Sequence, residues 1–286
     1  MEKKNKYIDL PGRGKYNIKN KLNNLTGKEW IKFTKSWFIH SPKRRKENEI
    51  LHPAKYPESL VEEFITFFSK EGDWVFDPFL GTGSTLIAAG NTGRNGIGIE
   101  LMKKYFDTAK KRITAGNFTS ELIPVLGSSL KLKTLLKEHL GEKKIDYVIT
   151  SPPYWNQLER NNIRQKNRKA TGLDTRYSKK KEDIGNIREY EDFIEKQAEI
   201  FDEIFDITKS GGYLTIITNN VYFKSKLYPL AFDTATSLTK RGEKSWVLKD
   251  EKIWLQNDKP LLPLGVNNAW VGNRHHQYCL IFRKEK

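Results

Sequence analysis

The run Ser151-Pro152-Pro153-Tyr154 directly follows the apolar stretch Ile145–Thr150 and has the most distinctive short pattern in the chain. Two successive prolines restrict the backbone and fix the directions of the Ser151 hydroxyl and the Pro152 carbonyl. Tyr154 adds a flat aromatic face beside these two acceptors. A simple turn would rarely combine a serine, two prolines and an aromatic residue after a buried strand. We therefore interpret the four residues as a catalytic site.

A second pattern, Asp77-Pro78-Phe79-Leu80-Gly81-Thr82-Gly83-Ser84-Thr85, follows a short apolar run and precedes a predicted helix. Glycines at such a point allow a tight turn and close approach of a ligand to the backbone. The dinucleotide fingerprint needs a third glycine where this chain has Leu86, and the Gly-Lys-Ser/Thr of a phosphate loop does not occur. The turn is thus either a tight connection or the binding site of a ligand without a pyrophosphate.

Glu100 ends the next predicted strand, 17 residues after Gly83. An acidic residue at this distance can accept hydrogen bonds from both hydroxyls of a ribose. Taken alone, Glu100 could equally be a surface carboxylate at a strand end. Together with the glycine turn, it favours a ligand of the adenosine type.

Strands and helices alternate around both patterns. Strands are predicted at 73–77, 95–100, 122–126, 145–150 and 212–218, and helices at 58–70, 84–91, 103–113, 130–140 and 190–208. This alternation predicts a doubly wound, mostly parallel sheet with helices on both faces. Two late strands are expected at 246–255 and 278–283, and Thr26-Gly27-Lys28-Glu29 predicts the start of a helix by its capping-box spacing. Residues 1–25 form a basic arm with little expected structure.

The charge of the chain is concentrated in two segments. Lys and Arg number 51 against 35 Asp and Glu, a net charge of +16 over 286 residues. Residues 1–50 hold 14 basic and 5 acidic side chains, and residues 156–188 hold 10 and 4. Such clustering favours a polyanionic partner. No run of 18 apolar residues and no signal peptide is present, so we expect a cytoplasmic protein without a membrane span.

Three motifs resemble those of the S-adenosylmethionine-dependent DNA amino-methyltransferases: His52–Pro57, Asp77–Thr85 and Ser151–Tyr154. The resemblance covers about residues 26–283. It implies a Rossmann-like methyltransferase fold with a seven-stranded sheet that includes a late antiparallel strand. It also implies S-adenosylmethionine as cofactor and no metal. The corresponding cofactor-binding residues here are His52, Pro53, Lys55, Pro57, Asp77, Pro78, Phe79, Gly81, Gly83, Ser84, Glu100 and Ser128.

The family assigns parts of the cofactor to individual positions. Residues matching Asp77, Phe79, Gly81 and Gly83 hold the methionine end, and the residue matching Glu100 holds the ribose. An acidic or polar residue usually follows the third strand near the adenine, where this chain departs from the pattern with Gly127-Ser128.

The family's catalytic motif explains the residue types of Ser151–Tyr154. An exocyclic amino nitrogen is a poor nucleophile because its lone pair is delocalised into the base. The Ser151 hydroxyl and the Pro152 carbonyl can hold the amino hydrogens and favour a tetrahedral nitrogen, which allows direct methyl transfer. Tyr154 can stack on a base that has left the duplex.

The target base follows from two observations. Serine at the first motif position occurs mainly in cytosine-N4 enzymes of the family, and aspartate mainly in adenine-N6 enzymes. Methylation of cytosine C5 needs a thiolate, whereas the one cysteine, Cys279, lies in an apolar predicted strand. We expect N4-methylcytosine as product, with adenine-N6 methylation as the alternative and a catalytically inactive nucleic-acid-binding module as a less favoured one. Such an enzyme would protect DNA against a separate, cognate restriction endonuclease.

Two polar segments are candidates for contact with duplex DNA, and both are expected as insertions in a single methyltransferase domain at 26–286. The segment 156–188 is basic and lacks apolar periodicity, which is typical of a surface loop or of a clamp on phosphates. The segment 254–277 is rich in amide and basic side chains that can read base edges. The candidate DNA contacts are Arg160, Arg164, Arg168, Lys169, Arg176, Gln256, Asn257 and Arg274.

Overall fold

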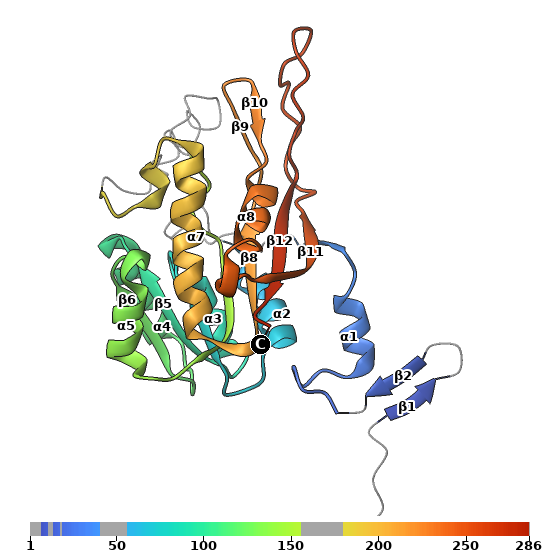
Figure 1. Cartoon of the computed structure of the whole chain (residues 1–286), viewed down its shortest axis with the longest axis vertical. Helices are drawn as coiled ribbons and strands as arrows, with labels where there is room; N and C mark the ends of the chain where they lie inside the picture. The colour runs from blue at the N-terminus through green and yellow to red at the C-terminus, as the bar shows by residue number, and fades with distance from the viewer. Residues whose placement is uncertain (1–6, 11–13, 18, 41–55, 156–179, 286) are drawn as a thin grey trace, which may run out of the picture.

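A computed structural model describes residues 7–10, 14–17, 19–40, 56–155 and 180–285 (Figure 1). Its largest feature is an eight-stranded sheet in the order β3-β11-β12-β8-β7-β4-β5-β6. The sheet strands are β3 (Trp37–Ile39), β4 (Trp74–Asp77), β5 (Asn95–Glu100), β6 (Leu122–Leu126), β7 (Ile145–Thr150), β8 (Thr208–Thr218), β11 (Val247–Leu255) and β12 (His276–Arg283). Strands β4 to β8 run parallel, and β12 is antiparallel to both of its neighbours.

The helices of the described residues cover both faces of this sheet. They are α1 (Gly27–Phe33), α2 (Glu58–Phe68), α3 (Ser84–Asn91), α4 (Lys103–Ala115), α5 (Leu132–Leu140), α7 (Tyr190–Ile207) and α8 (Leu230–Leu238). Helices α2 and α3 contribute to one apolar core cluster, and α5, α7 and α8 contribute to another. No helix in these ranges is long and apolar enough to cross a membrane.

Neighbouring side chains of the central strands pack in different core clusters, one on each face of the sheet. In β4, Val75 packs in the cluster on the α2 side, and Phe76 packs in the cluster on the α7 side. Tyr147 and Val148 of β7 divide in the same way. Successive side chains of a strand point to opposite faces, and these central strands are buried on both, which explains their continuous apolar sequences. The expected doubly wound, mostly parallel fold with a late antiparallel strand is confirmed.

Three details differ from the sequence prediction. The sheet has eight strands rather than seven, because β3 pairs in parallel with β11. The basic arm contains an antiparallel hairpin of β1 (Tyr7–Leu10) and β2 (Gly14–Asn17) where little structure was expected. Helix α8 and a second hairpin of β9 (Val221–Phe223) and β10 (Lys226–Tyr228) lie in a region without a clear pattern.

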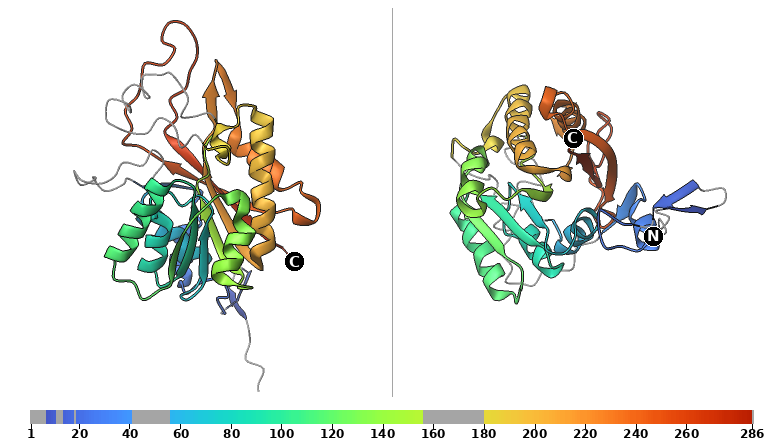
Figure 2. Two further views of the ribbon diagram at one scale, coloured as in Figure 1. Left: turned by 90° about the vertical axis from the view of Figure 1, so that its left-hand side faces the viewer. Right: turned by 60° about the horizontal axis from the view of Figure 1, so that its bottom comes forward.

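The strand order changes direction between β4 and β7, which is where ligands bind in open α/β sheets. The glycine turn follows β4, and Ser151–Tyr154 follow β7, so both motifs lie at the same edge of the sheet. Because β11 runs parallel to β8, the segment 256–275 between β11 and β12 also leaves from this edge. Figures 1 and 2 show this segment and the β9–β10 hairpin extending beyond the body of the sheet on that side.

Candidate active site

The carboxylate of Asp77 joins three elements around the glycine turn. Its Oδ1 accepts hydrogen bonds from the Phe79 amide at 3.0 Å and from the Thr150 hydroxyl of β7 at 2.7 Å. Its Oδ2 accepts from the Tyr56 hydroxyl at 2.6 Å and from the Thr85 hydroxyl at 2.5 Å. A carboxylate offers about four acceptor positions, so the chain itself occupies all of them. Asp77 therefore fixes the turn relative to the end of β7.

All four acceptor positions of Asp77 are used within the chain, and the contact with the methionine end of the cofactor that the resemblance implies stays a prediction. The side chain is fully buried and does not line the pocket described below. Burial raises the pKa of the Asp77 carboxyl, while its four donors favour the ionised form. A cationic ligand group could reach this carboxylate only by displacing a donor of the chain.

Both glycines of the turn have a backbone conformation that favours glycine, and at Gly83 close packing also excludes a side chain. Both Gly81 and Gly83 have positive φ, at 58° and 89°. At Gly83 a Cβ atom would also come within 2.9 Å of the Cβ of Ala109 in α4. Gly83 thus permits the close packing of α3 on α4, whereas Gly81 lines the pocket and donates its amide hydrogen toward Glu100.

Glu100 lies at the carboxyl end of β5 with one hydrogen bond to each of its oxygens. Oε2 accepts from the Gly81 amide at 2.8 Å, and Oε1 accepts from the Met102 amide at 2.7 Å. One acceptor position therefore remains on each oxygen, which suits a ligand with two neighbouring hydroxyls. Burial raises the pKa of the Glu100 carboxyl to about 7, against the opposing effect of the two amide donors.

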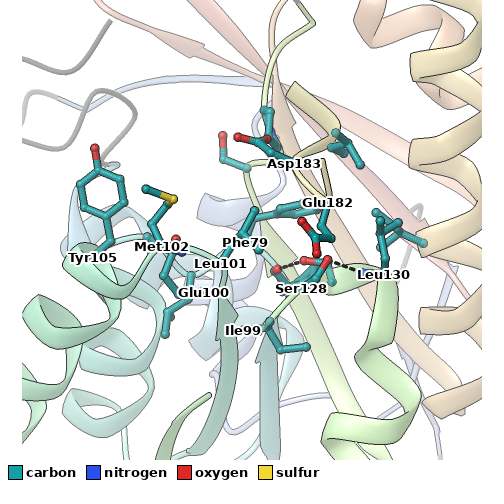
Figure 3. A pocket seen from close by; sticks show the side chains of 18 of the residues that line it. Phe79, Ile99, Glu100, Leu101, Met102, Tyr105, Ser128, Leu130, Glu182 and Asp183 are labelled. Carbon is teal, nitrogen blue, oxygen red and sulfur yellow. Dashed lines mark hydrogen bonds between the residues drawn. The ribbon is translucent and has the colours of Figure 1, made fainter. Parts of the chain in front are cut away.

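A pocket of about 840 Å³, including space open to solvent, lies over this edge of the sheet (Figure 3). Eight of the sequence-predicted residues line it: Pro78, Phe79, Gly81, Ser84, Glu100, Ser128, Ser151 and Pro153. Ser128 also accepts a hydrogen bond from the Leu130 amide at 3.3 Å. Pro57, which precedes α2, does not line the pocket, nor do Asp77 and Gly83. His52, Pro53 and Lys55 lie outside the described residues.

The sequence reasoning missed much of the apolar wall. Met102, Tyr105 and Leu130 line the pocket and follow β5 and β6, as Figure 3 shows. Glu182, Asp183 and Ile184 also line it, and Asp183 accepts a hydrogen bond from the Gly185 amide at 2.9 Å. Apolar residues of this kind have the same pattern as core residues, so the sequence held no separate signal for them. Tyr56 also lines the pocket and lies within His52–Pro57, but the resemblance assigns it no role.

Ser151 and Tyr154 form the other end of the site. The Ser151 Oγ lies 3.1 Å from the Tyr154 hydroxyl oxygen, and Ser151 and Pro153 both line the pocket. The Tyr154 hydroxyl also lies 3.0 Å from Oε1 of Gln277 in β12. The pocket therefore has a carboxylate at the end of β5 and a serine hydroxyl after β7, and Pro152 lies between the two lining residues of the motif.

The one cysteine and the groups that could hold a metal ion were also candidates for chemistry. Burial raises the pKa of the Cys279 thiol to about 12, and the side chain is fully buried in β12, so it is not a reactive thiolate. Among the described residues, no cluster of three or more His, Cys, Asp or Glu side chains is arranged to hold a metal ion.

The candidate DNA contacts are in different environments. Gln256 is buried, its backbone amide donates to the His275 carbonyl at 2.7 Å, and its Oε1 accepts from Lys259. Asn257 is exposed, and the half-buried Arg274 lies over the ring of Tyr222. Arg160, Arg164, Arg168, Lys169 and Arg176 lie outside the described residues.

Comparison with known proteins agrees with this geometry. A profile of the DNA methylase family matches residues 2–111 and 145–286, which include the glycine turn, Glu100 and Ser151–Tyr154. The chain belongs to this DNA methylase family. The family resemblance inferred from the three motifs is confirmed. The profile match covers both ends of the pocket, whereas Ser128, Ser129 and Leu130 of its wall lie in the unmatched segment 112–144.

Individual relatives of the methylase family match shorter segments. Type II methyltransferase M2.DpnII of Streptococcus pneumoniae is 45% identical over 69 residues, which are 24% of this chain and 26% of that protein. Type II methyltransferase M.HinfI of Haemophilus influenzae is 37% identical over 121 residues, 41% of this chain and 30% of that protein. The matches thus span less than a third of these curated relatives. A methyltransferase structure from Pyrococcus furiosus aligns with a TM-score of 0.46 at 16% identity, over 83% of this chain and 88% of that one.

Proposed function

We propose that this protein transfers a methyl group from S-adenosylmethionine to the exocyclic N4 of cytosine in duplex DNA. The observation that carries the proposal is a single pocket lined by Glu100 at the end of β5 and by Ser151 after β7. The first residue suits a ribose, and the second suits an amino group that must be held by acceptors. Membership of the DNA methylase family supports DNA as the substrate.

The pocket fits the proposed cofactor by the chemistry of its walls. Glu100 retains one acceptor position on each carboxylate oxygen for a ribose diol, and Ile99, Met102 and Leu130 offer apolar surface for an adenine. Phe79 and Gly81 line the part nearer the glycine turn, where the methionine end would lie. When bound, S-adenosylmethionine supplies a methyl group on a positively charged sulfur.

The residues after β7 would act by holding the amino group. The Ser151 hydroxyl and the Pro152 carbonyl accept its two hydrogens and favour a tetrahedral nitrogen with its lone pair free. One nitrogen–carbon bond then forms as the sulfur–carbon bond breaks, and the positive charge moves from sulfur to nitrogen. The nitrogen finally releases one proton to water. Cys279 is buried and protonated, which is consistent with a reaction that needs no covalent intermediate.

The segments near the pocket would contact the duplex. We propose residues 26–286 as one methyltransferase domain with DNA-contacting insertions at 156–188 and 254–277. The second insertion leaves the sheet at the edge that carries the pocket, and Asn257 and Trp270 are exposed on it. Arg274 adds a positive charge close to Tyr222. Gln256 is held inside the chain and would support the segment rather than read bases.

Nucleoside mass spectrometry of duplex DNA treated with the protein and S-adenosylmethionine tests the proposed target. N4-methylcytosine as product supports it, with the Ser151→Ala variant as the matched control. N6-methyladenine as the sole product would refute the cytosine assignment and leave amino-methylation intact. The absence of any methylated base would refute the proposed function. Resistance of the treated DNA to a restriction endonuclease that cuts at the modified site would support a protective role.

A further inference from the structure

The hydroxyl of Tyr154 has contacts that stacking on a base would not require. Its oxygen lies 3.1 Å from the Ser151 Oγ, 3.0 Å from the Gln277 Oε1 and 3.4 Å from the backbone carbonyl oxygen of Ile217. The first two distances are at the long end for O–H···O hydrogen bonds, as catalytic hydrogen bonds often are before the substrate binds. A phenylalanine would offer the same aromatic face without these contacts.

The positions of the hydrogens follow from the chemical nature of the partners. Both the Gln277 Oε1 and the Ile217 carbonyl can only accept hydrogen bonds, so the single hydrogen of the Tyr154 hydroxyl must point toward one of them. The hydrogen in the contact between Tyr154 and Ser151 must then come from Ser151. If Tyr154 donated to Ser151 instead, its oxygen would face two carbonyl oxygens with no hydrogen between them.

A serine hydroxyl carries one hydrogen and two lone pairs. When that hydrogen is donated to Tyr154, both lone pairs of the Ser151 Oγ remain for an incoming donor. The amino group of a target base would direct its hydrogens toward the Ser151 oxygen. A Ser151 hydrogen that also pointed into the pocket would meet these hydrogens and prevent a hydrogen bond. The ionised carboxylate of an aspartate has no hydrogen to direct, whereas a serine needs a partner that takes it.

We propose that Gln277 is a positioning residue that acts through Tyr154 to make Ser151 a pure hydrogen-bond acceptor toward the target amino group. This inference rests on the proposed function. The relay runs from the Ser151 hydroxyl to the Tyr154 hydroxyl and then to the Gln277 Oε1. Tyr154 consequently has two separable contributions, a ring that packs against the base and a hydroxyl that orients Ser151.

The sheet holds Gln277 in the position that the relay needs. Gln277 lies in β12, paired with Trp254 of β11, and the next residue pairs with Thr218 at the end of β8. Asn219 donates a hydrogen bond from its Nδ2 to the His276 carbonyl at 3.0 Å, which secures the start of β12 beside β8. The antiparallel strand β12 thereby brings a side chain from the end of the chain to the motif that follows β7.

Three variants separate the relay from folding and from base stacking. Tyr154→Phe keeps the ring, and Gln277→Met keeps the approximate size of the side chain without an acceptor. Each is expected to lower the single-turnover methylation rate at saturating DNA by about 10-fold to 100-fold, less than the loss of a direct transition-state hydrogen bond. The KM for DNA should change less than threefold. Gln277→Glu, which can only accept when ionised, should restore most of the rate.

The test of mechanism is a double-mutant cycle with Ser151→Ala. Once the Ser151 hydroxyl is gone, Gln277→Met should cause no further loss of the residual rate. An equal loss in both backgrounds would overturn the relay, as would wild-type rates in Tyr154→Phe. Gln197→Met is the control for a structural effect, because the buried Gln197 accepts a hydrogen bond from Thr234 in a helix contact. If the wild-type protein itself made no methylated base, the proposed function would be refuted, and with it the relay that rests on it.

Discussion

The glycine turn beside Glu100 and the segment 256–275 differ in the burial and hydrogen bonding of their side chains. At the turn, Asp77 and Glu100 are buried and together accept six hydrogen bonds from the chain. On the segment, Trp270, Leu261 and Val266 are 92%, 77% and 62% exposed. The Asn273 side chain accepts a hydrogen bond from the Leu262 amide through Oδ1 and donates one to the Leu262 carbonyl through Nδ2. These two bonds stabilise the segment although its apolar side chains face solvent.

This contrast indicates two modes of ligand binding. The turn is ordered before a ligand arrives, so a small molecule would bind there at a low cost in ordering. The segment carries apolar surface that only a large partner could cover. Substitutions in one region should therefore leave the function of the other intact.

Ser151 lies between the two regions and should affect the reaction more than binding to either. Ser151→Ala is expected to lower the methylation rate by about 10²–10³-fold, because one preorganised hydrogen bond is lost in the transition state. Single-turnover kinetics measures the rate, and titrations with cofactor and DNA measure binding. A rate close to that of the wild type would remove Ser151 from the mechanism.

Glu100→Ala should weaken binding of S-adenosylmethionine by about 10-fold to 150-fold, as expected for the loss of charge-assisted hydrogen bonds. Affinity for duplex DNA should not change, because Glu100 lies within the pocket. Calorimetry measures the first quantity and fluorescence anisotropy the second. Glu121→Ala is the control, since this exposed carboxylate lies just before β6, at the opposite edge of the sheet. Equal effects of the two variants would contradict the assignment of Glu100.

Trp270→Ala should weaken binding to duplex DNA by about 5-fold to 150-fold, in line with the loss of one aromatic contact to a base. Cofactor affinity should stay at the wild-type value. Ile31→Ala is the control, because Ile31 is a similarly exposed apolar side chain on α1. Unchanged DNA affinity in Trp270→Ala would exclude Trp270 as a DNA contact.

The raised pKa of Glu100 predicts the smallest of these effects, a pH dependence of cofactor binding. A diol is bound best by the ionised carboxylate, and the free protein holds a proton there below pH of about 7. Affinity should therefore fall by up to about tenfold for each pH unit below 7. The raised pKa also affects the free energy of unfolding of the unliganded protein. Protonated Glu100 contributes its full stabilisation below a pH of about 4.5, and this contribution is lost as the pH rises through about 7.

Calorimetry in two buffers with different ionisation enthalpies should detect the proton released on binding at pH 6.5. Glu100→Gln should bind more weakly and should lose the pH dependence. If the slope persists in this variant, another group is responsible for it.

The sequence predicted the elements whose signal is local. The capping box at Thr26 and Glu29 is formed, and the bounds of β4 to β7 agree within one residue with those expected. Strand β8 begins at Thr208, four residues before its expected start. Strand β3 was not predicted, because its three residues follow a helix and pair with residues of β11 more than 200 positions later. Strand pairing over such a distance has no local pattern in one sequence.

In the candidate site too, residues with a local sequence signal were predicted and residues brought in by distant strand pairing were not. Ser151 was predicted from its motif and Glu100 from its position at the end of a predicted strand, and both line the pocket. The hydrogen bonds of Asp77 within the chain were not predictable, because three of its four donors come from outside the turn or from the helix that follows it. Gln277 was not selected either, because only the pairing of β12 with β8 brings it to Tyr154.

The pairing of β3 with β11 has a consequence for shortened forms of the protein. Trp37–Ile39 cover the backbone of Ile253–Leu255, and the Lys252 ammonium donates to the carbonyls of Phe33 and Lys35 nearby. Removing residues 1–40 would leave β11 as a bare outer strand beside an ammonium that has lost its acceptors. Unpaired strands of this kind recruit other chains. A protein that lacks residues 1–40 is therefore expected to aggregate, whereas one that starts at residue 19 keeps β11 covered by β3.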